Sequence, residues 1–443
     1  MGIVIKILQF LMSFSLLILI HEFGHFIAAR MFKIKVEKFY LFFNPWFSLV
    51  RIRGKQTEFG IGWVPLGGYC KIAGMIDESM DKEQLKQPPQ PDEYRSRPAG
   101  QRLLVVSGGV IMNIVLAFCI YTGINYVWGE HYTANSDVRY GYVFSETGRA
   151  AGFQNGDKIV NINGRQIENT RRFPLKMLAR RNAVVEVDRG GQRTSVTISD
   201  DLAAQMLTEP LLSPRIPFVV DSLMSDGGAA AAGILSGDSL VAVGGTAMDF
   251  ADQFQDAFQA NKGQTVDVTL VRDSAGVDIE KTLPVAISAS GTIGVFLSPS
   301  ERFIPETVIT YNFWQAIPAS FKRTGTEVAD YWTQFKLMFR PHMHAGKHLG
   351  GPIGIANMYR PYWDFEAFWS FTAFLSIVLA VMNILPIPGL DGGHIMFLAV
   401  EVVTRRKPSD KFLERAQMVG MILILALILF ATSNDIQRIF FRH

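Results

Sequence analysis

The chain has 443 residues, of which 43 are basic and 40 acidic, so its formal net charge is only +3. No basic stripe interleaved with aromatic residues runs through it, which argues against nucleic acid as a partner. Hydrophobic residues make up 49% of the chain, modestly more than in a typical soluble protein. We therefore expect membrane segments combined with soluble domains.

Four stretches are long and apolar enough to cross a membrane as helices, which takes about twenty residues. They run from Ile3 to about Ala29, from Leu103 to about Val127, from about Phe365 to Leu385, and from about Ala416 to Ala431. Lys and Arg residues, which favour the cytoplasmic side, follow the first stretch and lie between the third and the fourth. We expect both termini, and the long segment between the second and third stretches, to face the periplasm of a bacterium.

The first stretch contains the motif His21-Glu22-Phe23-Gly24-His25. Two histidines four residues apart lie on one face of a helix and can bind the same Zn²⁺, while Glu22 can accept a proton from water that the metal activates. A secretory signal is a poorer interpretation, because the apolar run is too long and holds these ionisable residues. A satisfied polar knot between helices is also less favoured, because ionisable residues inside a span usually mark function.

Two regions of different composition follow the first stretch. Residues 36–71 are aromatic and β-branched with intervening Gly and Pro, which predicts short strands and turns. They are apolar enough to dip into the membrane, where protein or a water-filled cavity must satisfy their backbone groups. Residues 77–101 are charged and proline-rich, which predicts an exposed cytoplasmic linker.

The outer segment contains an internal repeat. Residues 151–160 and 232–241 share Ala-Gly, an apolar anchor, Gly-Asp and an alternating strand, and Gly152 and Asp157 both recur 81 positions later. The pattern resembles PDZ domains, small β-rich modules that capture peptide ends by strand addition, and we place two such modules at 140–215 and 216–300. Two unrelated β modules are the less favoured alternative. The modules lack a catalytic serine with partners, so we interpret them as filters or docking sites.

Residues 301–364 form a connector to the third span. Aromatic and polar residues at helical spacing from Phe313 to Arg340 predict a helix, which either lies at the membrane interface or packs on the second β module. His342, His344 and His348 follow. They are either a second metal site or part of an exposed connector, and the connector is favoured.

A hydrolytic zinc needs a third protein ligand beside the two histidines. Asp391 offers a carboxylate within residues 383–394, which close the third span. Pro386 and Pro388 break the helix there, so that the carboxylate can turn toward the metal. His394 is a lower-ranked candidate for the same position. A mixed histidine and carboxylate set favours zinc, although Co²⁺ or Mn²⁺ could also bind.

Together these motifs, the four spans and the repeats resemble the site-2 protease family of intramembrane zinc metalloproteases, and within it the bacterial regulator of sigma-E protease type with tandem PDZ domains. The resemblance covers nearly the whole chain. It implies that His21, His25 and Asp391 bind one Zn²⁺ per chain and that Glu22 is the base. The implied fold is a polytopic α-helical membrane protein with two periplasmic PDZ-like domains, whose catalytic halves are residues 1–128 and 365–443.

The resemblance also implies residues that bind substrate. Residues 59–69 are similar to the family's membrane-dipping β-hairpin, which we place at about 58–75 and whose edge holds substrate as an extended strand. The residues implied are Gly67, Gly68 and Tyr69 in the hairpin, and Asn383, Pro386 and Pro388 in the segment that closes the third span. Asn383 takes a substrate-binding or oxyanion role. The start of the second span, with Gly108, Gly109 and Asn113, also resembles the family.

In function, the resemblance implies an inner-membrane enzyme that cleaves single-span proteins within the bilayer, such as anti-sigma factors in stress signalling or remnant signal peptides. The PDZ-like domains are expected to exclude substrates with large outer domains. One alternative is a non-enzymatic membrane adaptor with a structural zinc, in which Glu22 has no role. A zinc transporter is disfavoured, because the second and fourth spans show no further ionisable residues to pass the metal on.

Overall fold

A computed structural model describes residues 1–75, 88–200, 202, 211–274, 276–340 and 350–440. The chain forms two compact units, which we describe separately. The helical unit comprises Met1–Gly129, Thr310–Lys336 and Ala345–His443. The repeat unit comprises Glu130–Ile309 and Leu337–His344.

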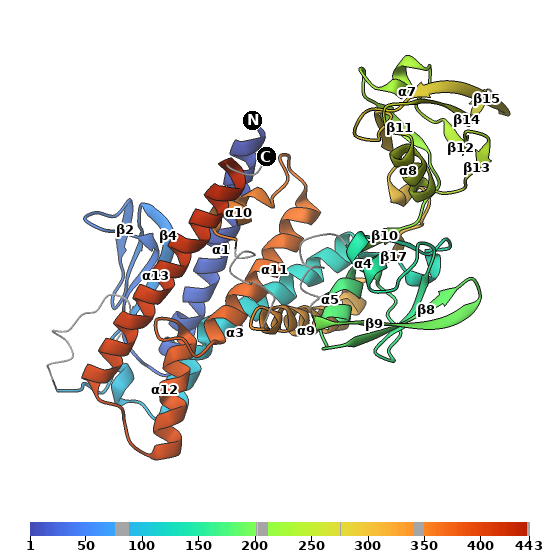
Figure 1. Cartoon of the computed structure of the whole chain (residues 1–443). Helices are drawn as coiled ribbons and strands as arrows, with labels where there is room; N and C mark the ends of the chain where they lie inside the picture. The colour runs from blue at the N-terminus through green and yellow to red at the C-terminus, as the bar shows by residue number, and fades with distance from the viewer. Residues whose placement is uncertain (76–87, 201, 203–210, 275, 341–349, 441–443) are drawn as a thin grey trace. The chain divides into compact units, whose positions relative to one another are not determined.

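The helical unit contains four helices that are long and apolar enough to cross a membrane (Figure 1). They are α1 (Gly2–Met31), α3 (Ala99–Val127), α11 (Phe365–Ile384) and α13 (Asp410–Phe440). The four predicted spans are thus present as helices. The fourth is longer than the predicted stretch from Ala416 to Ala431, because polar residues at both of its ends continue the helix.

Helix α3 is the central element of the helical unit and contacts α1, α11 and α12. Its Gly108 lies against Gly24 of α1, and a Cβ at Gly108 would come within 2.5 Å of the Gly24 carbonyl oxygen. Small residues at such a crossing let two backbones approach closely, which is how helices associate where lipid removes the hydrophobic driving force. The α1–α3 contact therefore fixes the helix that carries the histidine motif.

Three further helices complete this unit: α9 (Phe313–Leu337), α10 (Pro352–Asn357) and α12 (Asp391–Thr404). The predicted connector helix is α9, and it packs on α3 and α11: Asn125 donates to Ser320 Oγ at 2.8 Å, and Tyr331 packs edge-on against Phe374. The contacts join α9 to the long helices of the helical unit, and its position at a membrane interface stays a prediction. The cluster His342, His344 and His348 lies outside the described residues.

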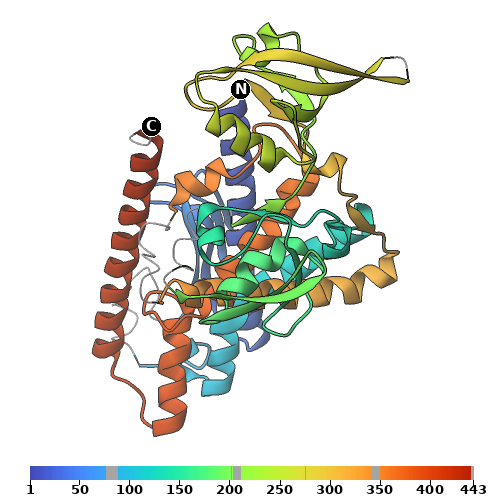
Figure 2. The same ribbon diagram turned by 45° about the vertical axis from the view of Figure 1, so that its right-hand side comes forward.

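Helix α12 was not predicted. Its 14 residues are too few to cross a bilayer, and its first residues, Asp391-Gly392-Gly393, are typical of a turn. After α12 the chain turns, and α13 runs back from that turn (Figure 2). The third candidate ligand, Asp391, is therefore the first residue of a helix rather than part of a bent loop.

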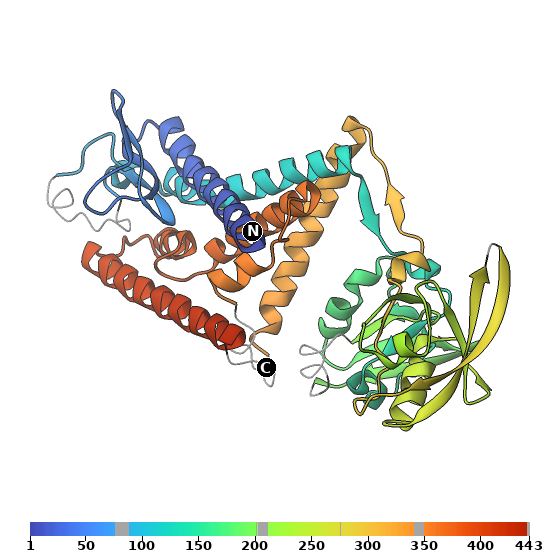
Figure 3. The ribbon, with the colours of Figure 1, turned by 90° about the horizontal axis from the view of Figure 1, so that it is seen from above.

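A four-stranded sheet follows α1 and packs beside it (Figure 3). Its strands are β1 (Val36–Phe43), β2 (Val50–Arg53), β3 (Glu58–Ile61) and β4 (Val64–Ile72), in the order β2-β3-β1-β4. The predicted hairpin at 58–75 is wrong in its pairing, because β1 lies between β3 and β4 and pairs with both. The chain crosses the end of β1 at Gly62, where any side chain would overlap the Phe43 carbonyl.

The expected exposed linker at 77–101 is only partly within the described residues, which resume at residue 88. In the described part, Tyr94 is buried, and its backbone N–H donates to the Ala73 carbonyl oxygen just after β4. Helix α3 already begins at Ala99. The prediction of an exposed linker through residue 101 was therefore wrong at this end, because Glu93 and Tyr94 are buried and α3 has begun, whereas residues 88–92 are exposed.

The segment Glu130–Ile309 of the repeat unit begins with β5 (Glu130–Tyr132) and ends with β17 (Thr307–Ile309), and these two short strands pair. Between these strands lie two sets of elements in the same order. The first set is β6 (Tyr142–Phe144), α4 (Glu146–Ala150), β7 (Lys158–Ile162), α5 (Phe173–Leu178), β8 (Ala183–Arg189), β9 (Gln192–Ile198) and β10 (Leu212–Pro214). The second is β11 (Val220–Leu223), α7 (Gly228–Ala231), β12 (Ser239–Val243), α8 (Ala251–Ala260), β14 (Thr265–Ser274), β15 (Val277–Ala286) and β16 (Val295–Leu297), with β13 (Thr246–Ala247) after β12.

The two sets pair alike. Strands β7, β8 and β9 form one sheet and β12, β14 and β15 its counterpart, while the first and last strands of each set pair with each other. Each set encloses its own core of buried apolar side chains. The repeat detected in the sequence is therefore a repeat of structure, and its identity with PDZ domains stays a prediction.

The Gly-Asp turn of each repeat holds a buried ion pair. Asp157 and Asp238 are each only 1% exposed; the first binds Arg189 at 2.7 Å and the second binds Arg272 at 2.6 Å. Each aspartate also accepts a backbone N–H three residues before it, from Gln154 or Leu235. In each repeat, the carboxylate of the Gly-Asp turn thus binds an arginine on the strand that follows the longer helix, β8 in the first repeat and β14 in the second.

The Asp238 pair predicts a pH-dependent stability. Burial raises the pKa of Asp238, but hydrogen bonds from Arg272 and from the Leu235 N–H lower it further, so that it lies below its ordinary value. A depressed pKa in the folded state stabilises the fold above the ordinary pKa, and this contribution is lost as the pH falls through the folded pKa. Asp238→Asn is expected to destabilise the second repeat by about 3 kcal/mol at pH 7.

Amide hydrogen exchange of the full-length protein measures this effect through the protection of β12 and β14. Asp278→Asn, the same change at an exposed position on β15, is the control. The difference between Asp238→Asn and wild type should shrink as the medium becomes more acidic than the folded pKa. Equal protection of the two proteins at pH 7 would contradict the prediction.

Candidate metal centre

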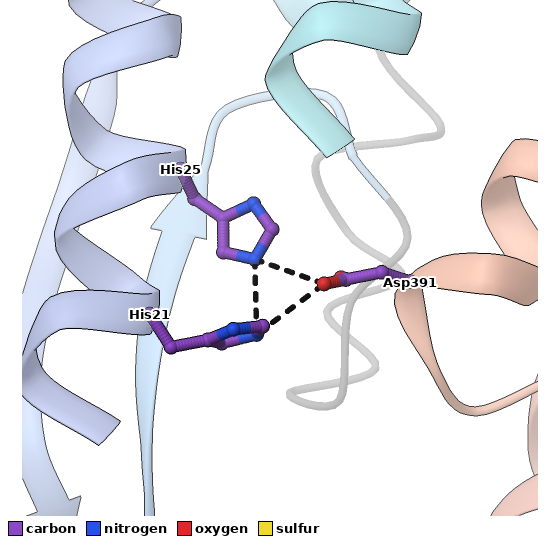
Figure 4. Close-up of side chains that lie close together, drawn as sticks. All are labelled: His21, His25 and Asp391. Carbon is purple, nitrogen blue, oxygen red and sulfur yellow. Dashed lines mark hydrogen bonds and ion pairs between the residues drawn. The ribbon is translucent and has the colours of Figure 1, made fainter. Parts of the chain in front are cut away.

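Helix α1 brings His21 and His25 onto one face, and α12 brings Asp391 opposite them (Figure 4). The Nε2 atoms of both histidines lie 3.3 Å from Asp391 Oδ2 and 3.4 Å from each other. Among the described residues, this is the cluster of histidine, cysteine and acidic side chains that could hold a metal ion. The structure therefore assembles the three predicted ligands from segments about 370 positions apart.

These distances match the ligand spacing of a tetrahedral zinc. With ligand atoms at 2.0–2.1 Å from the metal, neighbouring corners of a regular tetrahedron are separated by about 3.3–3.4 Å. Asp391 Oδ2 is buried and faces the two Nε2 atoms without a hydrogen bond of ordinary geometry, although a buried carboxylate oxygen normally accepts one. The triangle of ligand atoms therefore fits a bound zinc, with a fourth position left for water.

The second nitrogen of each histidine is held by α3. His25 Nδ1 lies 2.9 Å from the Val105 carbonyl oxygen, so Nδ1 carries the proton and Nε2 is free to bind metal. His21 Nδ1 lies 3.1 Å from the Asn113 amide. Asn113 Oδ1 is buried without a partner, so an amide orientation that lets Oδ1 accept the His21 Nδ1 proton satisfies both groups.

Gly109 of α3 makes room for the two imidazole rings. A Cβ at this position would lie 2.5 Å from His21 Cε1 and 2.5 Å from His25 Nε2. Real Cβ atoms do not approach other heavy atoms so closely, so any side chain here must displace the ligands. The absence of a side chain at residue 109 is therefore a requirement of the centre.

Glu22 points toward the sheet rather than into the ligand triangle. Its carboxylate accepts the backbone N–H of Cys70 in β4, and a Cβ at Gly68 would lie 3.5 Å from Glu22 Cγ. Because Glu22 follows His21 directly, it stays beside the metal ligands while facing β4. A carboxylate between a metal and a strand edge can exchange protons with water that enters there.

In the segment 383–388 at the end of α11, one of the three residues expected to bind substrate lies at the metal centre. Asn383 is buried, and its Nδ2 lies 3.4 Å from His21 Nε2, beside the metal position. Pro388 instead packs on α13, where a side chain at Gly420 would overlap its carbonyl, and Pro386 is exposed. Of the three residues expected to handle substrate in this segment, the structure brings Asn383 to the site.

The three residues expected in β4 lie on different faces of the strand. Gly68 packs against Ile18 and Glu22 of α1. Gly67 lies against the Phe43 ring, and Tyr69 stacks on Tyr40 while donating to Asn44 Oδ1 at 2.9 Å. Gly68 is thus at the centre, while the side of the strand that carries residues 67 and 69 faces away from it. His394, the alternative ligand, is not part of the ligand cluster among the described residues.

Asn113 should tune metal affinity. Asn113→Leu keeps the size of the side chain but removes the acceptor for His21 Nδ1, and loss of such an outer partner typically weakens metal binding about 10- to 100-fold. Zinc dissociation constants from competition with a chelator measure the effect. Asn357→Leu, the same change at an exposed position, is the control. Equal affinity in Asn113→Leu and wild type would show that α3 does not orient His21.

Comparisons with known proteins find a family model and relatives that match nearly the whole chain. The model of "Peptidase family M50" matches residues 9–427. Proteins named "Putative zinc metalloprotease" from Xylella fastidiosa and Treponema pallidum are 27% and 25% identical to the chain, over 96% and 98% of it and 97% and 100% of their own lengths. A protein of Haemophilus influenzae named "Regulator of sigma E protease" is 25% identical, over 97% of the chain and 98% of its own length.

Proposed function

The chain belongs to peptidase family M50 and is a zinc metalloprotease, and on this premise we propose that it hydrolyses peptide bonds within the membrane-spanning segments of single-span proteins. The proposal includes one zinc per chain, bound by His21, His25 and Asp391, with Glu22 as the base. It also places the protein in a bacterial inner membrane, with both termini and the repeat unit in the periplasm and the segment around residues 77–101 in the cytoplasm.

The position of the centre along α1 carries the proposal. The 30 residues of α1 span about 45 Å, whereas the hydrocarbon core of a bilayer is about 30 Å thick. If α1 is centred in the bilayer, His21 lies about 7 Å and His25 about 13 Å from the midplane. Both distances are smaller than half the thickness of the core, so peptide bonds that reach these ligands lie inside the membrane.

The residues of the centre have distinct roles in the proposed reaction. Zinc, when bound, supplies a Lewis acid that polarises a carbonyl and lowers the pKa of water. The water oxygen attacks the carbonyl carbon while Glu22 takes one of its protons. The carbon–nitrogen bond then breaks as Glu22 passes this proton to the leaving nitrogen. Asn383 Nδ2 lies where it can donate to the oxygen on which negative charge develops.

Strand β4 is the proposed docking strand for substrate. In the described sheet it lies at the edge and pairs with β1 alone, so a further strand would add at its other edge, where the Cys70 N–H donates to Glu22. Glu22 sits against β4 at Gly68 and Cys70. A peptide bond in a helix is shielded by its own hydrogen bonds, so a substrate that adds to this edge as an extended strand becomes open to attack.

The repeats are proposed to act as a PDZ-like filter. Substrates would be anti-sigma factor-like proteins or signal-peptide remnants whose outer domain has already been removed, which agrees with the name of the Haemophilus influenzae relative. Deletion of residues 142–298 is expected to permit cleavage of untrimmed substrates. The assay compares trimmed and untrimmed versions of one substrate, with Glu22→Gln in the same deletion background as the control. An unchanged preference for trimmed substrate would overturn the filter and leave the proposed chemistry intact.

A further inference from the structure

The two parts of the metal centre lie on helices that are separate in sequence. His21 and His25 belong to α1, whereas Asp391 begins α12, which the chain enters through Gly389 at φ +96°. A zinc site tolerates deviations of only about 0.2 Å in its ligand distances. The position of α12 relative to α1 must therefore be fixed, and a directional polar contact fixes orientation as well as distance.

An ion pair between α3 and α12 has this property. Arg102 donates to both carboxylate oxygens of Glu401, from Nη2 to Oε1 at 2.5 Å and from Nη1 to Oε2 at 3.1 Å. Arg102 also donates through Nε to the Arg97 carbonyl at 3.0 Å, and it is only 7% exposed. A two-point contact between a planar guanidinium and a carboxylate fixes orientation as well as distance.

The same face of α3 contacts both histidines of the centre and helix α12. Arg102, Val105, Gly109 and Asn113 are spaced by three, four and four residues, which places them along one side of the helix. Val105 accepts from His25, Gly109 accommodates both rings, and Asn113 pairs with His21. Arg102 extends this line by one turn and reaches α12 ten residues, or about 15 Å, beyond Asp391.

We propose that Arg102 and Glu401 are positioning residues that hold α12 in the register at which Asp391 completes the zinc ligand set. This inference rests on the proposed zinc site. A buried ion pair adds little net stability compared with apolar residues of the same size, so stability alone does not account for it. Leu398 of α12 is buried in a core with Val105 and Val106 of α3, and this apolar contact holds the two helices together without a directional bond. The ion pair supplies the direction.

The test removes both charges together, because a single substitution would leave one buried charge unpaired. The variant is Arg102→Met with Glu401→Met in the full-length, detergent-solubilised protein. Zinc dissociation constants come from chelator competition, melting temperatures are measured for the metal-free protein, and the visible spectrum of the Co²⁺ form reports ligand geometry. Arg51→Met with Glu58→Met, which removes a more exposed pair in the sheet, is the matched control.

The expected result is a zinc dissociation constant raised about 10- to 100-fold in the α3–α12 variant, with an altered Co²⁺ spectrum and an unchanged metal-free melting temperature. The control should bind zinc like wild type. A dissociation constant within twofold of wild type in the α3–α12 variant would overturn the inference, as would weaker binding accompanied by an equal loss of metal-free stability. If the wild-type protein bound no zinc, the proposed zinc site itself would be wrong.

Discussion

Glu22→Gln is expected to bind zinc like wild type and to lose peptide-bond cleavage, with kcat reduced by about 10²- to 10⁴-fold. The amide keeps the size of the side chain but cannot take a proton from water or return it to the leaving nitrogen. Zinc binding should persist, because the three ligand atoms belong to His21, His25 and Asp391 and none belongs to Glu22.

The measurement uses purified protein in detergent with a single-span model substrate, and bound zinc is assayed in the same samples. Glu366→Gln is the control, because it makes the same chemical change in the first turn of α11, 17 residues from Asn383. Cleavage by Glu22→Gln at the wild-type rate would show that Glu22 is not the base. That result would favour a structural zinc in a membrane adaptor.

Gly109→Ala is expected to abolish stoichiometric zinc binding, and activity with it. The added methyl group would lie 2.5 Å from ring atoms of both His21 and His25, so either the rings or the α1–α3 crossing must shift. Alanine is otherwise the better helix former, by about 1 kcal/mol, so the substitution should not unfold α3 itself. The loss should therefore be specific to the metal centre.

The same helix provides a matched control in Gly123→Ala, where a Cβ has no heavy atom within 4 Å. Metal content by mass spectrometry, together with helix content by circular dichroism, separates loss of zinc from loss of fold. Gly123→Ala should retain one zinc and full activity. If Gly109→Ala also retained one zinc per chain, the close packing of α3 on the two histidines would be wrong.

The sequence predicted the parts of the centre that are encoded locally. The spacing of His21 and His25 fixes a shared helix face, and four apolar runs gave four long helices. Asp391 could be chosen because it is an isolated carboxylate at the end of a span. The constant offset of 81 predicted two structural repeats, because the turns at Asp157 and Asp238 are encoded locally: each aspartate accepts a backbone N–H three residues before it.

The parts that sequence reasoning missed depend on tertiary pairing. The hairpin at 58–75 failed because β1 inserts between β3 and β4, and strand propensity says nothing about the order of strands in a sheet. The acceptor for His25 is the backbone carbonyl of Val105. Every residue type has this carbonyl, so the identity of residue 105 could not indicate the hydrogen bond. Gly109 and Asn113 were noticed only through family resemblance, although their spacing along α3 could have indicated a common face.

Mapping the products of a single-span substrate tests the central proposal most directly. Wild-type protein reconstituted in vesicles is incubated with the substrate in ¹⁸O-labelled water, and the products are identified by mass spectrometry. We predict one cut inside the apolar span, with ¹⁸O in the new carboxyl terminus and no cut by Glu22→Gln. Cleavage only outside the span, or none by zinc-loaded wild type, would contradict it.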